Sequence, residues 1–294
     1  MRKILIWATA LLFSANNTFA GGYDPVTQDP VANPDAPPYM AELQFPSHGD
    51  NVNGHLYVAN GKGPHPTVVF LHGFPGNERD IDLMQALRRA GFNTLFFHYR
   101  GAWGSDGDYS LVHVLEDAGT AITLVRRLGN EAKHRIDPAR ISVIGHSLGG
   151  FNALVAGIED DALTCVVALA PADVYVLANA LLDNGFDLKS DVNTRPVPGL
   201  KNYSFADLIG EAVTNKARYS LVPRMSAFDG RPLLIVSGTE DVQVKLEEQL
   251  PLVKAAGGAK PFQHIVLNSD HSFSGVRIAL MRHITRWMGE NCRQ

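Results

Sequence analysis

The chain has 294 residues, of which 45% are hydrophobic and 19% are charged. These fractions are typical of a globular protein and exclude a disordered or fibrous chain. The formal net charge is −4 at pH 7. Proteins that bind the phosphate backbone of nucleic acids need a strongly basic balance, which this chain lacks. We therefore expect no nucleic-acid partner.

The first 20 residues have the pattern of a secretory signal peptide. Arg2 and Lys3 give a positive start, residues 4–13 are apolar, and small residues lead to a cleavage point after Ala20. This apolar run is too short for a bilayer core, which needs about 20 residues, and no later stretch is long enough. We expect a mature chain of 274 residues with a net charge of −6, without a membrane span, in the periplasm or secreted.

An extended arm and a single α/β domain follow the predicted leader. Residues 21–40 contain five prolines, which prevent a continuous helix or strand, so they are expected to form the arm. From residue 41 to residue 290, short apolar strands alternate with helical patterns. This alternation is typical of a mostly parallel sheet with helices on both faces.

Composition and periodicity place the elements of this domain along the chain. An antiparallel hairpin is expected from residues 41–45 and 54–59. The further strands are expected at residues 67–72, 93–99, 140–144, 165–170, 232–238 and 262–268. Helices are expected near residues 79–90, at 111–128, directly after Ser147, between the last two strands, and at 274–288. Residues 136–140, with the sequence IDPAR, are expected to form a turn.

Residues 172–230 interrupt the alternation of strands and helices. Residues 174–183 have a helical pattern, and Ser204 with Asp207 resembles a capping box at the start of another helix. Because a structureless loop of this length is unusual in a compact domain, we predict a small helical cap above the sheet. Its aromatic residues either line a substrate pocket or form the cap's own small core. They are Tyr175, Phe186, Tyr203, Phe205 and Tyr219.

The segment from Gly145 to Gly149 has the G-x-S-x-G spacing of a nucleophile elbow. It directly follows a predicted strand and directly precedes a predicted helix, which is the context that this motif requires. Small neighbours are needed because the chain reverses in one tight turn. The serine oxygen is then exposed at a helix N-terminus, where negative charge is favoured. We therefore predict that Ser147 is a nucleophile.

A serine nucleophile needs a base, and the base needs an acid that orients it. For this kind of elbow the chain order is Ser, then Asp or Glu, then His. His271 follows the last predicted strand and is the expected base. His264 and His283 lie inside a strand and a helix and are expected to be structural.

The acid is expected in the loop after the strand at 232–238, where Asp241 is favoured. Glu240 beside it and Asp173, which follows an earlier strand, are the alternatives. Asp270 adjoins His271 too closely to reach its ring and is expected to cap the loop.

Acyl transfer also needs two hydrogen-bond donors for the oxyanion. We expect these to be the backbone N–H groups of Leu148, the residue after the nucleophile, and of Phe74, in the loop after the strand at 67–72. Pro75 stiffens that loop and has no N–H of its own. His72 precedes the nucleophile and is expected to support the loop.

The two cysteines, Cys165 and Cys292, leave two possibilities open. They could pair and close a large loop, which would constrain the unfolded chain. Alternatively, Cys165 is a buried thiol in an apolar strand and Cys292 is an exposed thiol near the C-terminus. The sequence does not decide between these possibilities.

With these residues in place, the chain resembles the α/β-hydrolase family across residues 41–290. The motifs HGFPG, GHSLGG, SGTED and DHSF stand in the family's order and at the ends of the expected strands. The resemblance implies an eight-stranded, mostly parallel sheet and a triad of Ser147, His271 and Asp241. It also implies that the enzyme needs no cofactor and no metal ion.

Within this family, the segments HGFPGN and YRGAWGSDGDYS resemble those of bacterial acyl esterases of the feruloyl-esterase type. They also resemble the catalytic domains of prolyl-oligopeptidase-like peptidases. The mature chain has no room for the β-propeller of those peptidases, and Phe74 brings no hydroxyl group to the oxyanion loop.

The function expected from the sequence is a secreted carboxylic-ester hydrolase that acts on a small-molecule ester through an acyl-enzyme. A small serine peptidase or amidase is the alternative among enzymes. A non-catalytic binding protein with the same fold is the alternative of another class. The acyl and alcohol groups of the substrate and the oligomeric state do not follow from the sequence.

Overall fold

The computed structural model describes residues 23–293. The predicted signal peptide, residues 1–20, therefore lies outside the described residues. Within residues 23–293, no helix combines the length and the apolar composition that crossing a membrane requires.

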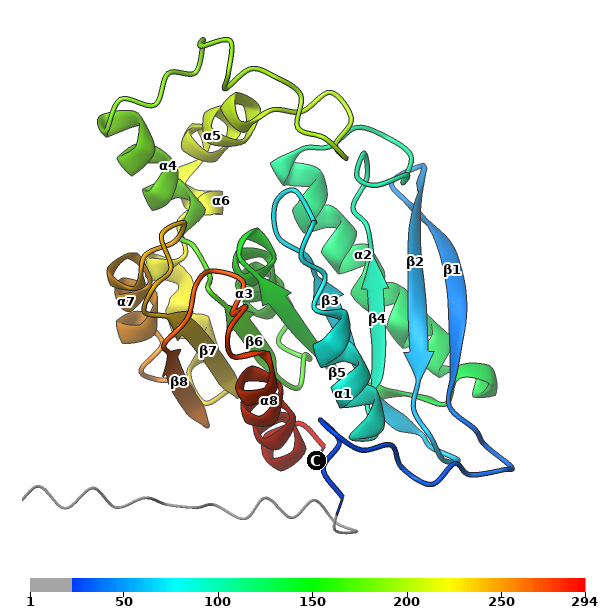
Figure 1. Cartoon of the computed structure of the whole chain (residues 1–294). Coiled ribbons are helices and arrows are strands. Elements are labelled where there is room, and N and C mark those ends of the chain that lie inside the picture. Colours follow the sequence, from blue (N-terminus) through cyan, green and yellow to red (C-terminus); the bar gives the residue numbers. More distant parts are fainter. Residues whose placement is uncertain (1–22, 294) are drawn as a thin grey trace, which may run out of the picture.

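An eight-stranded sheet runs through the molecule in the order β1-β2-β4-β3-β5-β6-β7-β8 (Figure 1). The pairs β1–β2 and β2–β4, which lie at one edge of the sheet, are antiparallel, and every other pair is parallel. The mostly parallel sheet and the hairpin predicted from the sequence are thus confirmed. The strands are β1 Tyr39–Ser47, β2 Asp50–Val58, β3 His65–Leu71, β4 Asn93–Phe97, β5 Ile136–His146, β6 Val166–Leu169, β7 Leu233–Gly238 and β8 Phe262–Leu267.

Helices cover both faces of the sheet, because the central strands are apolar on both sides. Successive residues of β3 show this: Val69 faces the core that includes α2 and α3, whereas Val68 faces the core that includes α1 and α8. The helices outside the cap are α1 Ile81–Arg89, α2 Leu111–Gly129, the short η1 Ala132–His134, α3 Leu148–Glu159, α7 Leu246–Ala255 and α8 Arg277–Asn291.

The turn predicted at residues 136–140 is wrong, because these residues belong to β5. The pairing of β3 with β5 shifts register there: His65 lies opposite Ile136, and Thr67 lies opposite Ile141. The extra residues on β5 form a bulge, which accommodates a proline that cannot donate to the ladder. The residue types at 136–140 favour a turn, but pairing with the distant strand β3 makes these residues part of a strand.

The region between β6 and β7 forms a helical cap above the sheet (Figure 1). Its elements are α4 Val174–Asp183, α5 Phe205–Thr214, α6 Lys216–Tyr219 and the 3₁₀ segment η2 Val222–Phe228. The predicted capping box is present, since Ser204 N donates to Asp207 Oδ2 at 2.8 Å and Asp207 N donates to Ser204 Oγ at 3.2 Å.

The N-terminal segment runs along the end of α1 and α8. Val26 is buried in the core between these helices and the sheet. Arg89 of α1 donates to the carbonyl groups of Pro25 at 2.5 Å and Val26 at 3.2 Å. Strand β1 begins at Tyr39, so the last two residues of the predicted arm belong to the sheet.

Cys165 and Cys292 form a disulfide, with their Cα atoms 5.8 Å apart. Cys165 directly precedes β6, and Cys292 directly follows α8. Both residues are buried, so the bond ties the C-terminal helix to the middle of the sheet. The structure thus answers the question that the sequence left open.

Candidate active site

Ser147 lies at the tight turn between β5 and α3. Its backbone angles are φ 58° and ψ −120°, a conformation that residues with a side chain rarely adopt and that is common at functional sites. Ser147 N donates to Leu169 O at 2.8 Å, and Phe151 N donates to Ser147 O at 3.0 Å. The neighbouring strand and the helix together hold this conformation in place.

The glycines of the elbow are required by the close packing of the backbone. A Cβ atom on Gly145 would lie 1.9 Å from the carbonyl oxygen of Gly149. A Cβ atom on Gly149 would lie 1.9 Å from the carbonyl oxygen of Leu71. Real Cβ atoms do not approach backbone so closely, so the G-x-S-x-G spacing has a steric cause at both of its glycines.

His271 and Asp241 meet through a buried contact of 2.7 Å between Nδ1 and Oδ2. The other carboxylate oxygen of Asp241 accepts from the backbone N–H groups of Gln243 and Val244, both at 2.9 Å. Because a carboxylate can only accept, His271 carries a proton on Nδ1, and in the neutral ring Nε2 is then the acceptor. Such a ring is ready to take a proton from a hydroxyl group.

The other carboxylates considered from the sequence lie elsewhere. Glu240 is exposed, and its carboxylate accepts from Thr239 Oγ1 at 3.3 Å. Asp173 is buried, and its Oδ2 accepts from the N–H groups of Leu221 at 2.7 Å and Val222 at 3.2 Å. Asp173 therefore ties α4 to the end of α6.

The remaining candidates are held in local interactions. Asp270 accepts from Ser274 N at 2.8 Å, and this hydrogen bond lowers its pKa. It caps its own loop, as expected. His264, in β8, contacts Ser237 Oγ at 2.9 Å, and His283 lies exposed on α8.

The two predicted oxyanion donors belong to the helix that follows Ser147 and to the loop after β3. Leu148 is the first residue of α3, so its N–H has no partner within the helix and lies at the positive end of the helix dipole. Phe74 lies in the loop after β3, which passes directly against the serine. A Cβ atom on Gly73 would lie 3.0 Å from Ser147 Cβ and 3.6 Å from Ser147 Oγ.

Three side chains fix the loop that carries Phe74. His72 Nδ1 contacts the carbonyl oxygen of Gly73 at 2.8 Å, and Tyr99 donates to the carbonyl oxygen of His72 at 3.1 Å. Trp103 Nε1 donates to Pro75 O at 2.7 Å. Burial lowers the pKa of His72 to about 4, so the ring is neutral near pH 7. Sequence reasoning assigned support to His72 and did not find Tyr99 or Trp103, whose contacts arise only in the folded chain.

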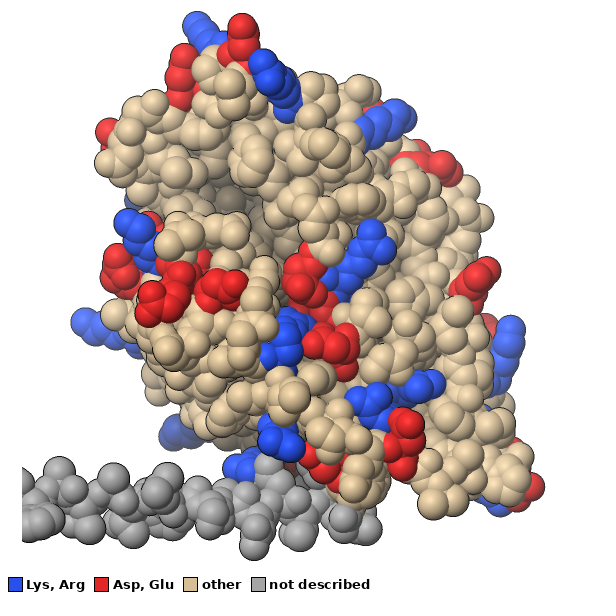
Figure 2. Space-filling view, in the orientation of Figure 1, with Lys and Arg blue, Asp and Glu red and all other residues tan. Residues whose placement is uncertain are grey.

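An aromatic cluster joins this loop to the cap. The ring of Phe74 lies 5.0 Å from that of Phe205 and 6.2 Å from that of Tyr203, and Tyr203 lies 4.8 Å from Tyr109. Of the five cap aromatics, Tyr203 and Phe205 thus approach the oxyanion loop, whereas Tyr219 is buried beside Phe151. Figure 2 shows the surface hollowed beneath the cap.

Two residues that the sequence did not single out hold the loop of His271. His146 Nε2 contacts the carbonyl oxygen of His271 at 2.8 Å. Arg277 Nη1 donates to the carbonyl oxygen of Ser272 at 3.1 Å. The position of His146 inside the elbow motif is the one feature of the sequence that could have pointed to its role. Nothing in the sequence points to the role of Arg277.

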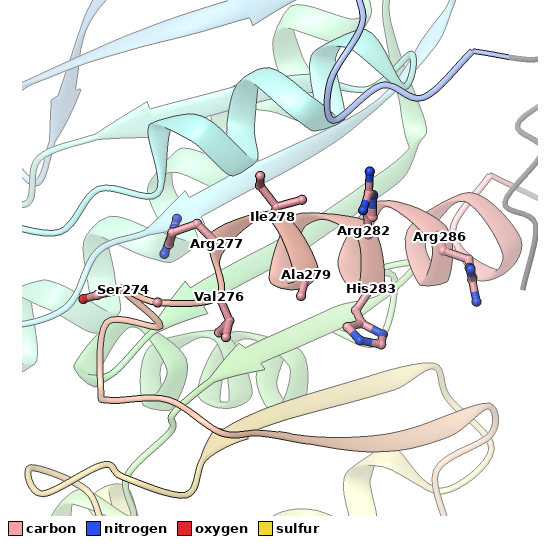
Figure 3. Close-up of a pocket in the computed structure, with 9 residues that line it drawn as sticks. Ser274, Val276, Arg277, Ile278, Ala279, Arg282, His283 and Arg286 are labelled. Atoms are coloured by element: carbon pink, nitrogen blue, oxygen red, sulfur yellow. The ribbon is translucent and has the colours of Figure 1, made fainter. Parts of the chain in front are cut away.

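A second concave surface, of about 650 Å³, lies along the outer side of α8. In Figure 3, Arg277 and Arg282 extend to one side of this helix, and His283 and Arg286 extend to the other. Arg282 pairs with Asp24 of the N-terminal segment at 3.0 Å. Within residues 23–293, no cluster of three or more His, Cys, Asp or Glu residues is arranged to hold a metal ion.

Comparison with known proteins decides the family. Residues 68–276 match the family described as "Alpha/beta hydrolase family". The chain belongs to the α/β-hydrolase family. It is 30% identical over 215 residues to the protein YfhR of Salmonella typhi, a match that covers 71% of this chain and 66% of that relative.

Solved structures share the fold. Est1E from Butyrivibrio proteoclasticus, determined with ferulic acid bound, superimposes with a TM-score of 0.69 at 21% identity, over 85% of this chain and 98% of Est1E. The acylaminoacyl peptidase of Pyrococcus horikoshii superimposes with a TM-score of 0.67 at 16% identity, over 87% of this chain and 42% of the peptidase. At these identities the two neighbours show that this α/β-hydrolase shares their fold, and no more.

Proposed function

We propose that this α/β-hydrolase cleaves carboxylic esters of small molecules with Ser147 as its nucleophile. The observation that carries the proposal is the 2.7 Å contact between His271 and Asp241, two buried side chains in the loops that follow β8 and β7. The elbow of Ser147 follows β5, at the same end of these parallel strands. Within this family of hydrolases, these are the three groups of an acyl-transfer triad in the expected chain order.

The proposed reaction has two halves. Ser147 Oγ attacks the ester carbonyl while His271 Nε2 takes its proton, and the N–H groups of Phe74 and Leu148 stabilise the oxyanion. His271 then gives the proton to the departing alcohol, which leaves an acyl group on Ser147. Water attacks this acyl-enzyme with His271 again as the base, and the carboxylic acid departs. Asp241 keeps the proton on Nδ1 and stabilises the imidazolium.

Ester hydrolysis is favoured over peptide hydrolysis by how the acidic residues of the cap are engaged. A peptidase of the exopeptidase kind needs a carboxylate that anchors the substrate's terminal amine. Asp173 and Asp207 accept backbone N–H groups within the cap, and Glu211 accepts from Leu111 N at 2.7 Å. The other candidates are exposed on the cap: Asp183, Asp187 and Asp191. This arrangement supports an aromatic and aliphatic acyl pocket without an amine anchor.

We also propose that the protein works in the periplasm or outside the cell. The leader-like pattern of residues 1–20 supports this location. The disulfide between Cys165 and Cys292 is consistent with it, because such bonds persist mainly in oxidising compartments.

The deciding measurement is kcat/KM for a short-chain p-nitrophenyl ester and for an alanyl or prolyl p-nitroanilide. We expect the ester to exceed the anilide by orders of magnitude, because the site offers little binding energy to position an amide. An anilide within about tenfold of the ester, about 1.4 kcal/mol in barrier, would favour the peptidase.

Covalent labelling with a fluorophosphonate provides the control on mechanism. The wild-type protein is expected to be labelled, and Ser147→Ala is expected to fold and remain unlabelled. Labelling of the alanine variant would remove Ser147 from its proposed role. A folded wild type with neither labelling nor turnover of any ester or anilide would instead favour a binding protein.

A further inference from the structure

The loop that carries His271 has no helix or strand over residues 268–276, yet side chains hold two of its consecutive carbonyl groups. The carbonyl oxygen of His271 lies 2.8 Å from Nε2 of His146, which is buried. The carbonyl oxygen of Ser272 accepts from Arg277 Nη1 at 3.1 Å. The backbone on both sides of this peptide unit is therefore tied to the body of the protein.

The contact defines the state of the His146 ring. A carbonyl oxygen can only accept, so His146 carries a proton on Nε2. Burial lowers the pKa of His146, which leaves Nδ1 without a proton near pH 7. Among the described residues, this second nitrogen is buried and has no hydrogen-bond partner. The ring is thus a neutral donor directed at the base loop.

The rings of His146 and His271 are neighbours, with centroids 4.9 Å apart. During acyl transfer the ring of His271 becomes positively charged. A neutral neighbour permits this charge, whereas a protonated one would oppose it. His146 therefore meets two requirements of a partner for the base, since it offers an N–H to the backbone and brings no positive charge.

Arg277, which donates to the carbonyl oxygen of Ser272, is itself held by two carboxylates. Arg277 Nη2 donates to Asp80 Oδ1 at 2.9 Å, and Arg277 Nε donates to Asp82 Oδ2 at 2.8 Å. Asp80 is buried at the start of α1. The acidic start of α1 thereby fixes the guanidinium group, and the guanidinium group fixes the loop.

We propose that His146 is a positioning residue for His271, with Arg277 as its companion. The inference rests on the proposed function, in which His271 is the base. The bond to Asp241 holds the ring of His271 at a single atom, and the loop is further held at Ser269, whose carbonyl oxygen accepts from Glu240 N at 2.9 Å, and at the buried Phe273. The bond from His146 fixes the backbone end of His271 itself. His146 directly precedes Ser147 in the chain. The same peptide segment therefore carries the proposed nucleophile and holds the backbone of the proposed base.

The test compares His146→Leu with His146→Gln. Leucine keeps the bulk and removes the donor, whereas glutamine keeps an N–H near the place of Nε2. Active sites are counted by stoichiometric fluorophosphonate labelling, and kcat is expressed per labelled site. We expect kcat of His146→Leu to fall about 10- to 100-fold with little change in KM, because small displacements of a catalytic group cost up to about 100-fold. His146→Gln is expected to recover most of the lost kcat.

The contrary results are distinct. Equal kcat per labelled site in the wild type and both variants, with only their thermal stability changed, would mean that His146 merely fills space. That result would overturn this inference and leave the proposed function standing, since labelling counts reactive Ser147. A wild-type protein without labelling or ester turnover would overturn both.

A double variant covers the case in which His146→Leu does not fold. Arg277→Met combined with Asp80→Asn releases the carbonyl group of Ser272 without leaving Asp80 charged and unpaired. A fall in kcat per labelled site at unchanged KM would support the proposal. An unchanged kcat would overturn it.

Discussion

The elbow and the cap are built in different ways. Around Ser147, backbone lies against backbone so closely that no Cβ atom fits at Gly145 or Gly149. In the cap, large apolar side chains remain in contact with solvent, with Val176 51%, Val192 72% and Phe205 48% exposed. Elements with few buried contacts open more readily than core elements. Ser147 thus stands on the more rigid of the two regions, and the cap is the softer one.

The two regions are nevertheless joined at defined points. Tyr203 and Phe205 of the cap both pack on Phe74 of the loop beside the elbow, with ring centroids 6.2 Å and 5.0 Å apart. Under the proposed function, a substrate that moved the cap would act on the loop of Phe74 through this aromatic contact. Because loops and insertions often carry specificity on a fixed scaffold, we expect the cap to be the part that sets specificity.

The largest expected effect concerns the rigid region alone. Asp241→Asn should lower kcat by about 10⁴, because the amide no longer keeps the proton of His271 on Nδ1. Glu240→Gln is the matched control and should keep most of the activity, since Glu240 is exposed. Ester hydrolysis at saturating substrate measures both. A loss in Glu240→Gln with activity retained in Asp241→Asn would move the acid by one residue.

The contrast in packing is tested by placing one methyl group in each region. Gly149→Ala should destabilise the protein by about 1–3 kcal/mol or more, because the added Cβ meets the backbone of Leu71. Gly210→Ala, inside cap helix α5, should stabilise it by about 0.5–1 kcal/mol, since that site is open within 4 Å. Urea unfolding of the two variants gives the values. Similar effects at both positions would remove the distinction drawn between elbow and cap.

A further expected effect is a dependence of stability on pH that arises beneath the site. Residues 172–230 contain no histidine, whereas burial holds the pKa of His72 at about 4 in the folded protein. In the unfolded chain this pKa is about 6.5. Between these pH values the unfolded state binds a proton that the folded state does not. The free energy of unfolding therefore falls as pH decreases from about 6.5 to about 4, by at most about 1.4 kcal/mol per pH unit from this residue.

Urea unfolding at pH 7 and pH 5 measures this effect, with His72→Asn as the comparison. Asparagine keeps a donor near the carbonyl group of Gly73 and does not titrate. The variant should lose less stability than the wild type between the two pH values. Equal losses would show that His72 does not contribute.

Much of the fold and of the candidate site could be predicted because the signals are local. The strand before Ser147, the glycines around it and the helix after it lie within about twenty residues of sequence, so steric rules for one turn suffice to recognise the elbow. The placement of His271 and Asp241 followed from the order of strands in a parallel sheet. In the structure these two side chains meet, and Asp173, the more distant alternative, serves the cap instead.

What the sequence by itself determined, then, is the alternation of strands and helices, the position of the cap and the residues placed at the ends of the strands. These follow from periodicity and from the geometry of single turns, which a short segment already contains. Tertiary structure alone decided that Cys165 bonds to Cys292, that residues 136–140 stay in β5, and that His146 and Arg277 hold the loop of His271. Each of these depends on contact between segments that are separated in the sequence. A local sequence pattern does not reveal which separated segments meet in the folded chain.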